Sequence, residues 1–237
     1  MEAEQPEIIL VGVVHGDPEG YDKLSKFFHR VRPRIISVEI SEYSWRYRRS
    51  QKALWQKRFQ HSRQSLPPQQ RHHLALHKLA AQIALPFEAR TAEDFAQQHG
   101  VSWQAVDINA IAREHLPRYD EELLSPDNLR NLVLTQDGAW GEYIRQEYRR
   151  ARRVLQAGRG SGVVMMTGAV SPQAGMREKV LAHRVAQLAK QWLRVVHVGG
   201  WEHLIRSGPR KTMADFLSVW RPQRVLLGSE FWDETRQ

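Results

Sequence analysis

The sequence predicts an α/β protein with a mainly parallel sheet and flanking helices. Short apolar runs rich in β-branched residues, at 8–14 and 34–40, are typical of strands that are covered on both faces. An amphipathic helical pattern separates the two runs, so the chain opens with a strand, helix, strand unit. The chain has 237 residues, which suffice for a substantial core, and we expect a single domain over 1–237.

Each element of the opening unit has its own signal. The first strand covers 8–14, and Asp17-Pro18 begins the helix, because aspartate accepts bonds from free helix amides and proline suits the first helical position. One face of this helix is apolar and carries Tyr21, Leu24, Phe27, Phe28 and Val31. The second strand follows over 34–40.

The middle of the chain is basic and helical in character. Prolines interrupt it at 67–68 and at 86, and we expect a helical insertion at about 44–98. Gly100 suits the end of the last helix in this region. The alternating residues of 101–108 then predict a third strand, with Asp107 near its end.

The last third of the chain contains a helix and two more strands. A helical pattern covers 176–193. Its buried stripe consists of Leu181, Val185, Leu188 and Trp192. The runs at 194–198 and 222–228 predict strands, and a helix around 213–220 precedes the last one.

The composition narrows the chemistry and the partners. Without cysteine, the chain has neither disulfides nor thiolate metal sites, so a metal would be held by His, Asp or Glu. No apolar run is long enough to span a bilayer, and we expect a cytoplasmic protein without a membrane partner. The formal net charge of +9 keeps nucleic acid as an alternative partner, although basic runs such as 44–63 are typical of solvated helix faces. The oligomeric state does not follow from the sequence.

Two copies of one short motif carry the candidate chemistry. The pattern Gly-x-x-His occurs at Gly12–His15 and again at Gly200–His203, each time after a strand-like run. In an open parallel sheet, ligands bind at the carboxyl ends of the strands. We therefore expect His15 and His203 to meet at one edge of the sheet.

Glu39 is the third candidate. A carboxylate near the end of a buried strand is unfavourable unless it is paired, hydrogen-bonded or bound to a metal. We expect His15 and Glu39 to lie at the ends of neighbouring strands, where they would share a metal ion or a water molecule. An imidazole and a carboxylate together provide metal ligands or a general base.

These residues resemble the TraB/PrgY family, which is related to the Tiki metalloproteases and, more distantly, to erythromycin esterase and ChaN-like proteins. Four blocks carry the resemblance in the order of the family. They are 11–41, which holds the first histidine motif and Glu39, then 100–111, 176–190 and 194–204. The resemblance implies a TraB/Tiki-like α/β fold.

By this resemblance, the protein is a hydrolase of peptide or ester bonds, with a small molecule or a peptide as its substrate. The implied catalytic residues are His15, Glu39, His203 and Arg177. The first three of these would hold a divalent Mn, Co or Zn ion or activate a water molecule. The implied substrate-binding residues are Glu178, Asp107 and Glu42. The chain departs from the family at Glu178, where aspartate is usual, and at Ser41, where an acid is frequent.

Other interpretations of the same residues stay open. Asp107 would equally serve as a cap of the following helix, and Arg177 with Glu178 as a surface pair. His197 lies within a strand and is expected to be structural. For the whole protein, one alternative is a non-catalytic module that retains the pocket for a peptide, a small ligand or haem. The other is a basic protein associated with nucleic acid.

Overall fold

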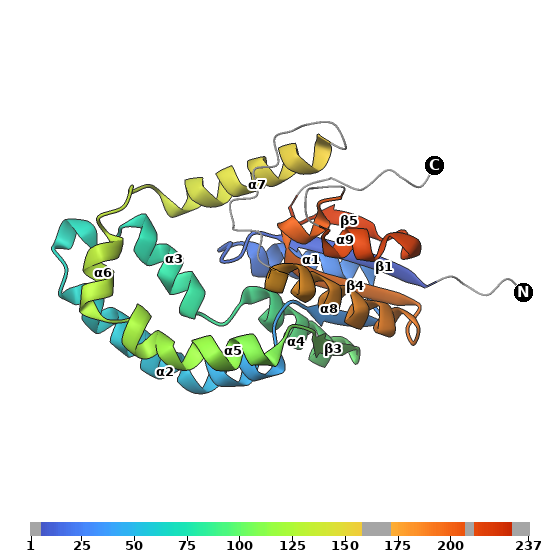
Figure 1. Cartoon of the computed structure of the whole chain (residues 1–237), viewed down its shortest axis with the longest axis horizontal. Coiled ribbons are helices and arrows are strands. Elements are labelled where there is room, and N and C mark those ends of the chain that lie inside the picture. The colour runs from blue at the N-terminus through green and yellow to red at the C-terminus, as the bar shows by residue number, and fades with distance from the viewer. Residues whose placement is uncertain (1–5, 158–171, 207–210, 229–237) are drawn as a thin grey trace, which may run out of the picture.

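The computed structural model describes residues 6–157, 172–206 and 211–228, which form an α/β fold (Figure 1). Five parallel strands make one sheet in the order β3-β2-β4-β1-β5. The strands are β1 (Glu7–Val13), β2 (Ile35–Val38), β3 (Ser102–Ala105), β4 (Arg194–Gly200) and β5 (Gln223–Leu226). Each overlaps a run that the sequence predicts as a strand, and the predicted fold class is confirmed.

Helices cover both faces of the sheet and also extend away from it. The α-helices are α1 (Gly20–Val31), α2 (Glu42–Gln64), α3 (Leu74–Ile83), α4 (Phe87–His99), α5 (Asn109–His115), α6 (Pro126–Leu132), α7 (Trp140–Gln156), α8 (Pro172–Ala189) and α9 (Met213–Phe216). Two short helical turns are used below, η3 (Tyr119–Leu123) and η5 (Trp201–Leu204). Among the residues that the structure describes, no helix is both long and apolar enough to cross a membrane.

The strand order corrects one expectation. β1 and β2 are not neighbours, because β4 lies between them and pairs with both. The expectation followed the order of the chain, whereas the last third of the chain returns to fill the centre of the sheet. Val195, Val196 and Val198 of β4 are fully buried, as a central strand between two helical layers requires.

Alternate residues of β1 face two different helical layers. Ile8 and Leu10 pack in a core with side chains of α7, α8 and α9. Ile9 and Val11 point to the other face, which α1 and α4 cover. Side chains alternate along a strand, so a continuous apolar run is what a strand between two helical layers needs.

The first helix buries the face that the sequence predicts, but it begins slightly later. Leu24, Phe27 and Phe28 of α1 are buried, and the helix starts at Gly20. Asp17 is buried in the preceding turn, where it accepts a hydrogen bond from the amide of Glu19 at 3.0 Å. It therefore orders the turn between β1 and α1 rather than capping the first helical residue.

A helical part, residues 42–83 and 109–133, extends from one end of the sheet (Figure 1). It has its own core, in which Trp55 and Leu129 are fully buried. The sequence predicted one insertion at about 44–98, but α4 within that range packs on the sheet instead. Two separate segments of the chain therefore build the helical part, with α4 and β3 between them in sequence.

Gly12, the glycine of the first histidine motif, allows η5 to approach β1 closely. A Cβ atom at this position would stand 2.8 Å from the Cα atom of Trp201 and 2.5 Å from a side-chain carbon of Leu204. The first distance is to backbone, which cannot rotate away. The turn that carries His203 therefore packs directly against the strand that leads to His15.

We predict that Gly12→Ala destabilises the fold by about 1–3 kcal/mol, because overpacking a buried site forces its neighbours apart. Gly175→Ala on α8 is the matched control, since a Cβ there meets no atom within 4 Å and alanine favours a helix. Urea unfolding of both variants measures the difference. Equal stabilities would contradict the close packing of η5 on β1.

Candidate active site

The two Gly-x-x-His motifs lie side by side, because they follow neighbouring strands. In the register of β1 and β4, Gly12 pairs with Gly199, which precedes Gly200. A Cβ atom on Gly200 would stand 3.2 Å from Nε2 of His15 and 3.7 Å from Oε2 of Glu39. The absence of a side chain at Gly200 thus leaves the space in which His15 and Glu39 approach one another.

Glu39 is the centre of a buried ion-pair network. Its side chain, 7% exposed, follows directly after β2. Nη2 of Arg177 on α8 donates to Oε1 at 2.6 Å, and Nε2 of His203 on η5 lies 2.9 Å from the same oxygen. The amide of Gly200 in β4 donates to Oε2 at 2.7 Å. The carboxylate therefore has the partners that its burial requires.

Two more carboxylates extend this network. Asp107, after β3, accepts from Nε and Nη2 of Arg177 at 2.9 and 2.7 Å, the bidentate geometry that arginine favours. Oε2 of Glu178 lies 2.8 Å from Nδ1 of His203 and also accepts from the amide of Met213 at 2.8 Å. Acid and base alternate along the network in the order Asp107, Arg177, Glu39, His203 and Glu178.

The alternation of acids and bases shifts the pKa values of the residues in the network. Burial lowers the pKa of His203, but the charge of Glu39 and the hydrogen bonds to Glu178 and Glu39 outweigh it and raise that pKa to about 10. Burial alone would raise the pKa of Glu39, but the neighbouring cations, His203 first among them, hold it well below its ordinary value. At neutral pH, His203 is an imidazolium and Glu39 is a carboxylate.

His15 forms a second and more open unit with Glu88, a residue that the sequence pattern did not single out. Nδ1 of His15 lies 2.7 Å from Oε1 of Glu88 on α4. The Glu88 side chain is 4% exposed, whereas that of His15 is 62% exposed. Partial loss of water lowers the pKa of His15, but the hydrogen bond to Glu88 and the charges of Glu88 and Glu39 raise it to about 9.

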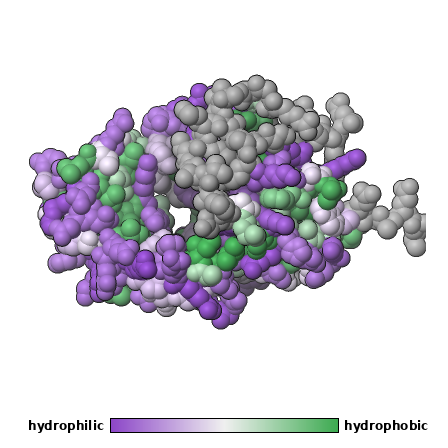
Figure 2. Space-filling view, in the orientation of Figure 1, coloured by the Kyte–Doolittle hydropathy of each residue, from purple (hydrophilic) through white to green (hydrophobic). Residues whose placement is uncertain are grey.

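His15 lines a cavity of about 930 Å³ between the sheet and the helical part. Figure 2 shows the surface hollowed between these two regions. Glu39 and Asp107 line the cavity from the sheet edge, and Glu88 lines it beside His15. Residues of α2, α3, α5 and α7 form the other walls. A cavity of this size accommodates a small organic molecule or a short peptide.

The residues that the sequence predicted for the site fall into three groups. One group lines the cavity and consists of His15, Glu39 and Asp107. A second group lies in the ion-pair network, outside the set that lines the cavity, and consists of His203, Arg177 and Glu178. Glu42 belongs to neither group, because it lies at the exposed start of α2 and pairs with Arg46.

Two expectations concern single residues near the network. Asp107 accepts from the amide of Ile108 at 2.8 Å and also binds Arg177, so it both orders the turn before α5 and extends the network. His197 on β4 is buried, with Nδ1 3.0 Å from the hydroxyl of Ser37. Burial lowers the pKa of His197 to about 3, and this neutral ring does not line the cavity, which agrees with a structural role.

Two of the three residues implied as metal ligands, Glu39 and His203, are already engaged by other protein groups. Both nitrogens of His203 face carboxylates, at 2.9 and 2.8 Å, so neither is open to a metal ion in this arrangement. Both oxygens of Glu39 already accept hydrogen bonds. Within the described ranges, no cluster of three His, Asp or Glu side chains is placed to hold a metal ion. Of the three implied ligands, His15 keeps a ring nitrogen toward the cavity, so this arrangement offers a metal one ligand atom rather than the set that the resemblance implies.

Glu88 had a signal in the sequence. It shares one helix face with Thr91, Ala92 and Phe95, and the structure buries all four residues. A carboxylate on the buried stripe of an amphipathic helix needs a partner. That partner, His15, is separated from it by 73 residues, so no local pattern connects the two.

The raised pKa of His203 determines how stability should depend on pH. An unfolded histidine loses its proton near pH 6.5, whereas folded His203 keeps it to about pH 10. The folded state binds more protons in this window, so the stabilisation is complete below pH 6.5 and is lost as the pH rises through 10. His203 should thus add about 1.4 kcal/mol per pH unit to the decline in unfolding free energy.

Urea unfolding of the wild type and of His203→Gln between pH 6.5 and 10 measures this decline. The variant should lose stability less steeply with pH than the wild type. His183→Gln, which replaces an exposed histidine of α8, should keep the wild-type slope. Equal slopes in the wild type and His203→Gln would argue against an ionic pair of Glu39 and His203.

Comparisons of the chain with models of protein families, with curated proteins and with solved structures find no match.

Proposed function

We propose that this protein is a hydrolase in which His15 activates a water molecule in the cavity. The His15–Glu88 pair is the observation that supports this most strongly. A buried carboxylate holds Nδ1 of the ring, and Nε2 is left beside Gly200 and Glu39. Histidines that act as general bases are commonly oriented by a carboxylate in this way.

The proposed reaction uses the neutral form of His15. The neutral ring keeps its proton on Nδ1, in the hydrogen bond to Glu88. Nε2 then has a lone pair, which takes a proton from water. The oxygen of that water attacks the carbonyl carbon of the substrate and forms a tetrahedral intermediate. The bond to the leaving group then breaks, and the imidazolium of His15 returns the proton to that group.

The ion-pair network has a positioning role in this proposal. Glu39 pairs with His203 and Arg177, yet its charge still contributes to the raised pKa of His15. Glu39 also holds the amide of Gly200, and thereby the strand end beside which His15 lies. His203 and Arg177 act through Glu39, since they are outside the set of residues that line the cavity.

Ester and peptide bonds are the proposed targets. This part of the proposal rests on the resemblance of 11–41, 100–111, 176–190 and 194–204 to the TraB/PrgY family. The cavity supports it, because it admits a small molecule or a short peptide next to a general base. Both bond classes present a carbonyl carbon to an attacking water.

A non-catalytic ligand-binding module is the second candidate, because the same cavity would hold a ligand without a reaction. Nucleic-acid binding has less support. Exposed arginines of α2 and α7 have acidic neighbours, as in the pairs Arg46–Glu42 and Arg145–Glu142. Such pairing is typical of solvated helices rather than of phosphate-binding faces.

Hydrolysis should increase with pH up to about 9, because His15 is a base only when it is deprotonated. Well below that pH, the rate should rise about tenfold per pH unit. His15→Gln should lower kcat/KM by a factor of about 10²–10⁴, the usual contribution of a general base. Assays with p-nitrophenyl esters and aminoacyl p-nitroanilides measure these rates, and EDTA should leave them unchanged.

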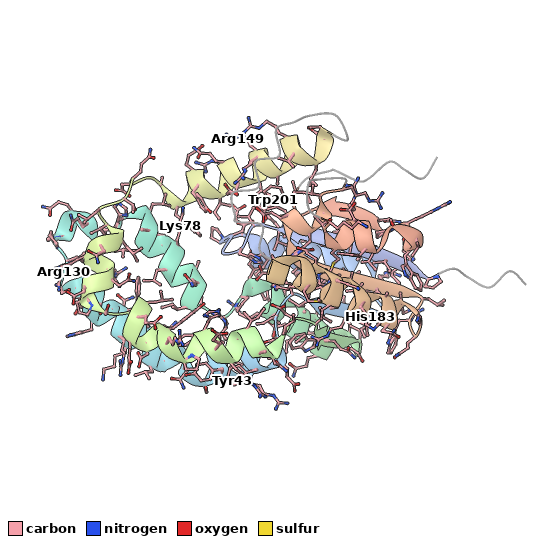
Figure 3. The ribbon with its side chains drawn as sticks, in the orientation of Figure 1. Tyr43, Lys78, Arg130, Arg149, His183 and Trp201 are labelled. Atoms are coloured by element: carbon pink, nitrogen blue, oxygen red, sulfur yellow. The ribbon has the colours of Figure 1, made fainter. Side chains whose placement is uncertain are left out.

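Two further variants make this test specific. Glu88→Gln keeps the shape of the partner but removes its charge, so the pH at which the rate levels off should fall toward the ordinary histidine value. His183→Gln, on α8 (Figure 3), should leave both rate and profile unchanged. Activity that persists in His15→Gln, or that requires a metal ion, would reject this mechanism. Ligand binding without any hydrolysis would favour the binding module.

A further inference from the structure

The cavity contains positive charges that the described residues do not neutralise. Arg48, Lys78 and Arg90 line it, and none of the three forms an ion pair with a carboxylate in the part of the chain that the structure describes. Other arginines of α2 differ, as Arg49 pairs with Glu93 at 2.8 Å. On α2, Arg48 faces the cavity without an ion-pair partner among the described residues, whereas its neighbour Arg49 has one.

Arg48 is held in place by neutral groups. Its Nε donates to the hydroxyl of Ser44 at 3.1 Å, and its Nη1 donates to the carbonyl groups of Gln82 and Ala84. Tyr119, which is neutral as well, lies with its ring centre 5.8 Å from Cζ of Arg48. Arg48 is half-buried, and burial lowers its pKa. These partners carry no negative charge, so an anion beside the guanidinium would compensate the charge of Arg48.

Lys78 on α3 reaches the same cavity from a second helix. Its Nζ lies 3.9 Å from the centre of the Tyr143 ring on α7, and Figure 3 labels Lys78 between these two helices. The ring stabilises the ammonium group but leaves its charge in place. α2 and α3 therefore each present a cation to the same cavity.

Most acidic groups of the cavity are already engaged. Four of its carboxylates bind a cation or an imidazole, namely Asp17, Glu39, Glu88 and Asp107. A fifth, the exposed Glu122, lines the cavity from η3. Among the described lining residues, one carboxylate and three cations thus lack an ion-pair partner, so the uncompensated charge of the cavity is positive.

The remaining lining is largely apolar and aromatic. Trp140 and Tyr143 on α7 stack with their ring centres 5.4 Å apart, and Phe87 and Ile111 contribute further apolar surface. Surfaces of this kind bind the apolar body of a ligand. A ligand that complements this cavity would therefore combine an apolar body with a negative charge.

We propose that the cavity binds a small organic anion, whose carboxylate or phosphate group is held by Arg48 and Lys78 and whose apolar body lies against the aromatic side chains of α7. Arginine binds both groups through paired hydrogen bonds, and lysine adds a point charge. This inference extends the proposed hydrolase, because an anion held there would bring its acyl bond into the cavity that His15 lines. Binding itself requires no reaction.

Calorimetric titration with anions that contain no hydrolysable bond tests binding alone. We expect cinnamate and phenylphosphonate to bind the wild type, and the uncharged cinnamyl alcohol to bind more weakly by a factor of about ten. Arg48→Gln and Lys78→Gln should each weaken the binding of both anions about tenfold and leave that of the alcohol unchanged. Lys52→Gln, which removes an exposed charge of α2 outside the cavity, should bind like the wild type.

Thermal unfolding of the same variants separates binding from a structural role of Arg48. A lower melting temperature of Arg48→Gln, together with normal anion binding by Lys78→Gln, would mean that Arg48 only supports the end of α3 and would overturn the proposal. Equal affinities for cinnamate and cinnamyl alcohol would also overturn it. Loss of anion binding in both variants without hydrolysis of any ester would keep the anion site and reject the hydrolase. Hydrolysis of neutral esters that depends on His15 but not on Arg48, with no anion binding, would keep the hydrolase and reject the anion site.

Discussion

The arrangement at the sheet edge depends on the buried carboxylate of Glu39. This side chain follows β2 and accepts hydrogen bonds from Arg177 on α8, from His203 on η5 and from the amide of Gly200 at the end of β4. One element near the start of the chain, β2, therefore meets three consecutive elements of its last third, α8, β4 and η5, at one group. Loss of any partner would leave an uncompensated charge in a buried place, which is among the costliest changes a fold can undergo.

The two histidine motifs share one pattern but have different surroundings. His203 is enclosed between two carboxylates, whereas His15 has one carboxylate partner and an open side toward the cavity. Their glycines are reciprocal: Gly12 admits the turn that carries His203, and Gly200 leaves room for His15. The fold thus places a closed, charged unit behind Glu39 and an open unit in front of it, at the edge where parallel sheets bind ligands.

Features that depend on local pattern could be predicted from the sequence. The five strands follow from apolar runs. The repeated motif predicted that His15 and His203 meet at one edge of the sheet, and the carboxylate after a buried strand added Glu39, as the structure has them. Features that depend on distant partners could not. Strand order was missed because β4 enters the sheet from the end of the chain. Glu88 was missed because its partner His15 lies on a distant part of the chain. Arg177 binds Glu39, which follows β2, and Asp107, which follows β3, and no spacing in the sequence reveals these pairs.

We propose that carboxylate partners give the two motif histidines different roles: His203 is a fixed cation, and His15 is a base that titrates at the cavity. Heteronuclear NMR of the imidazole nitrogens tests this directly, because an imidazolium and each neutral tautomer give distinct nitrogen shifts. We expect both nitrogens of His203 to stay protonated to about pH 10, and His15 to release the proton of Nε2 near pH 9 while it keeps that of Nδ1. A neutral His203 at physiological pH, or a His15 that keeps its proton on Nε2, would contradict it.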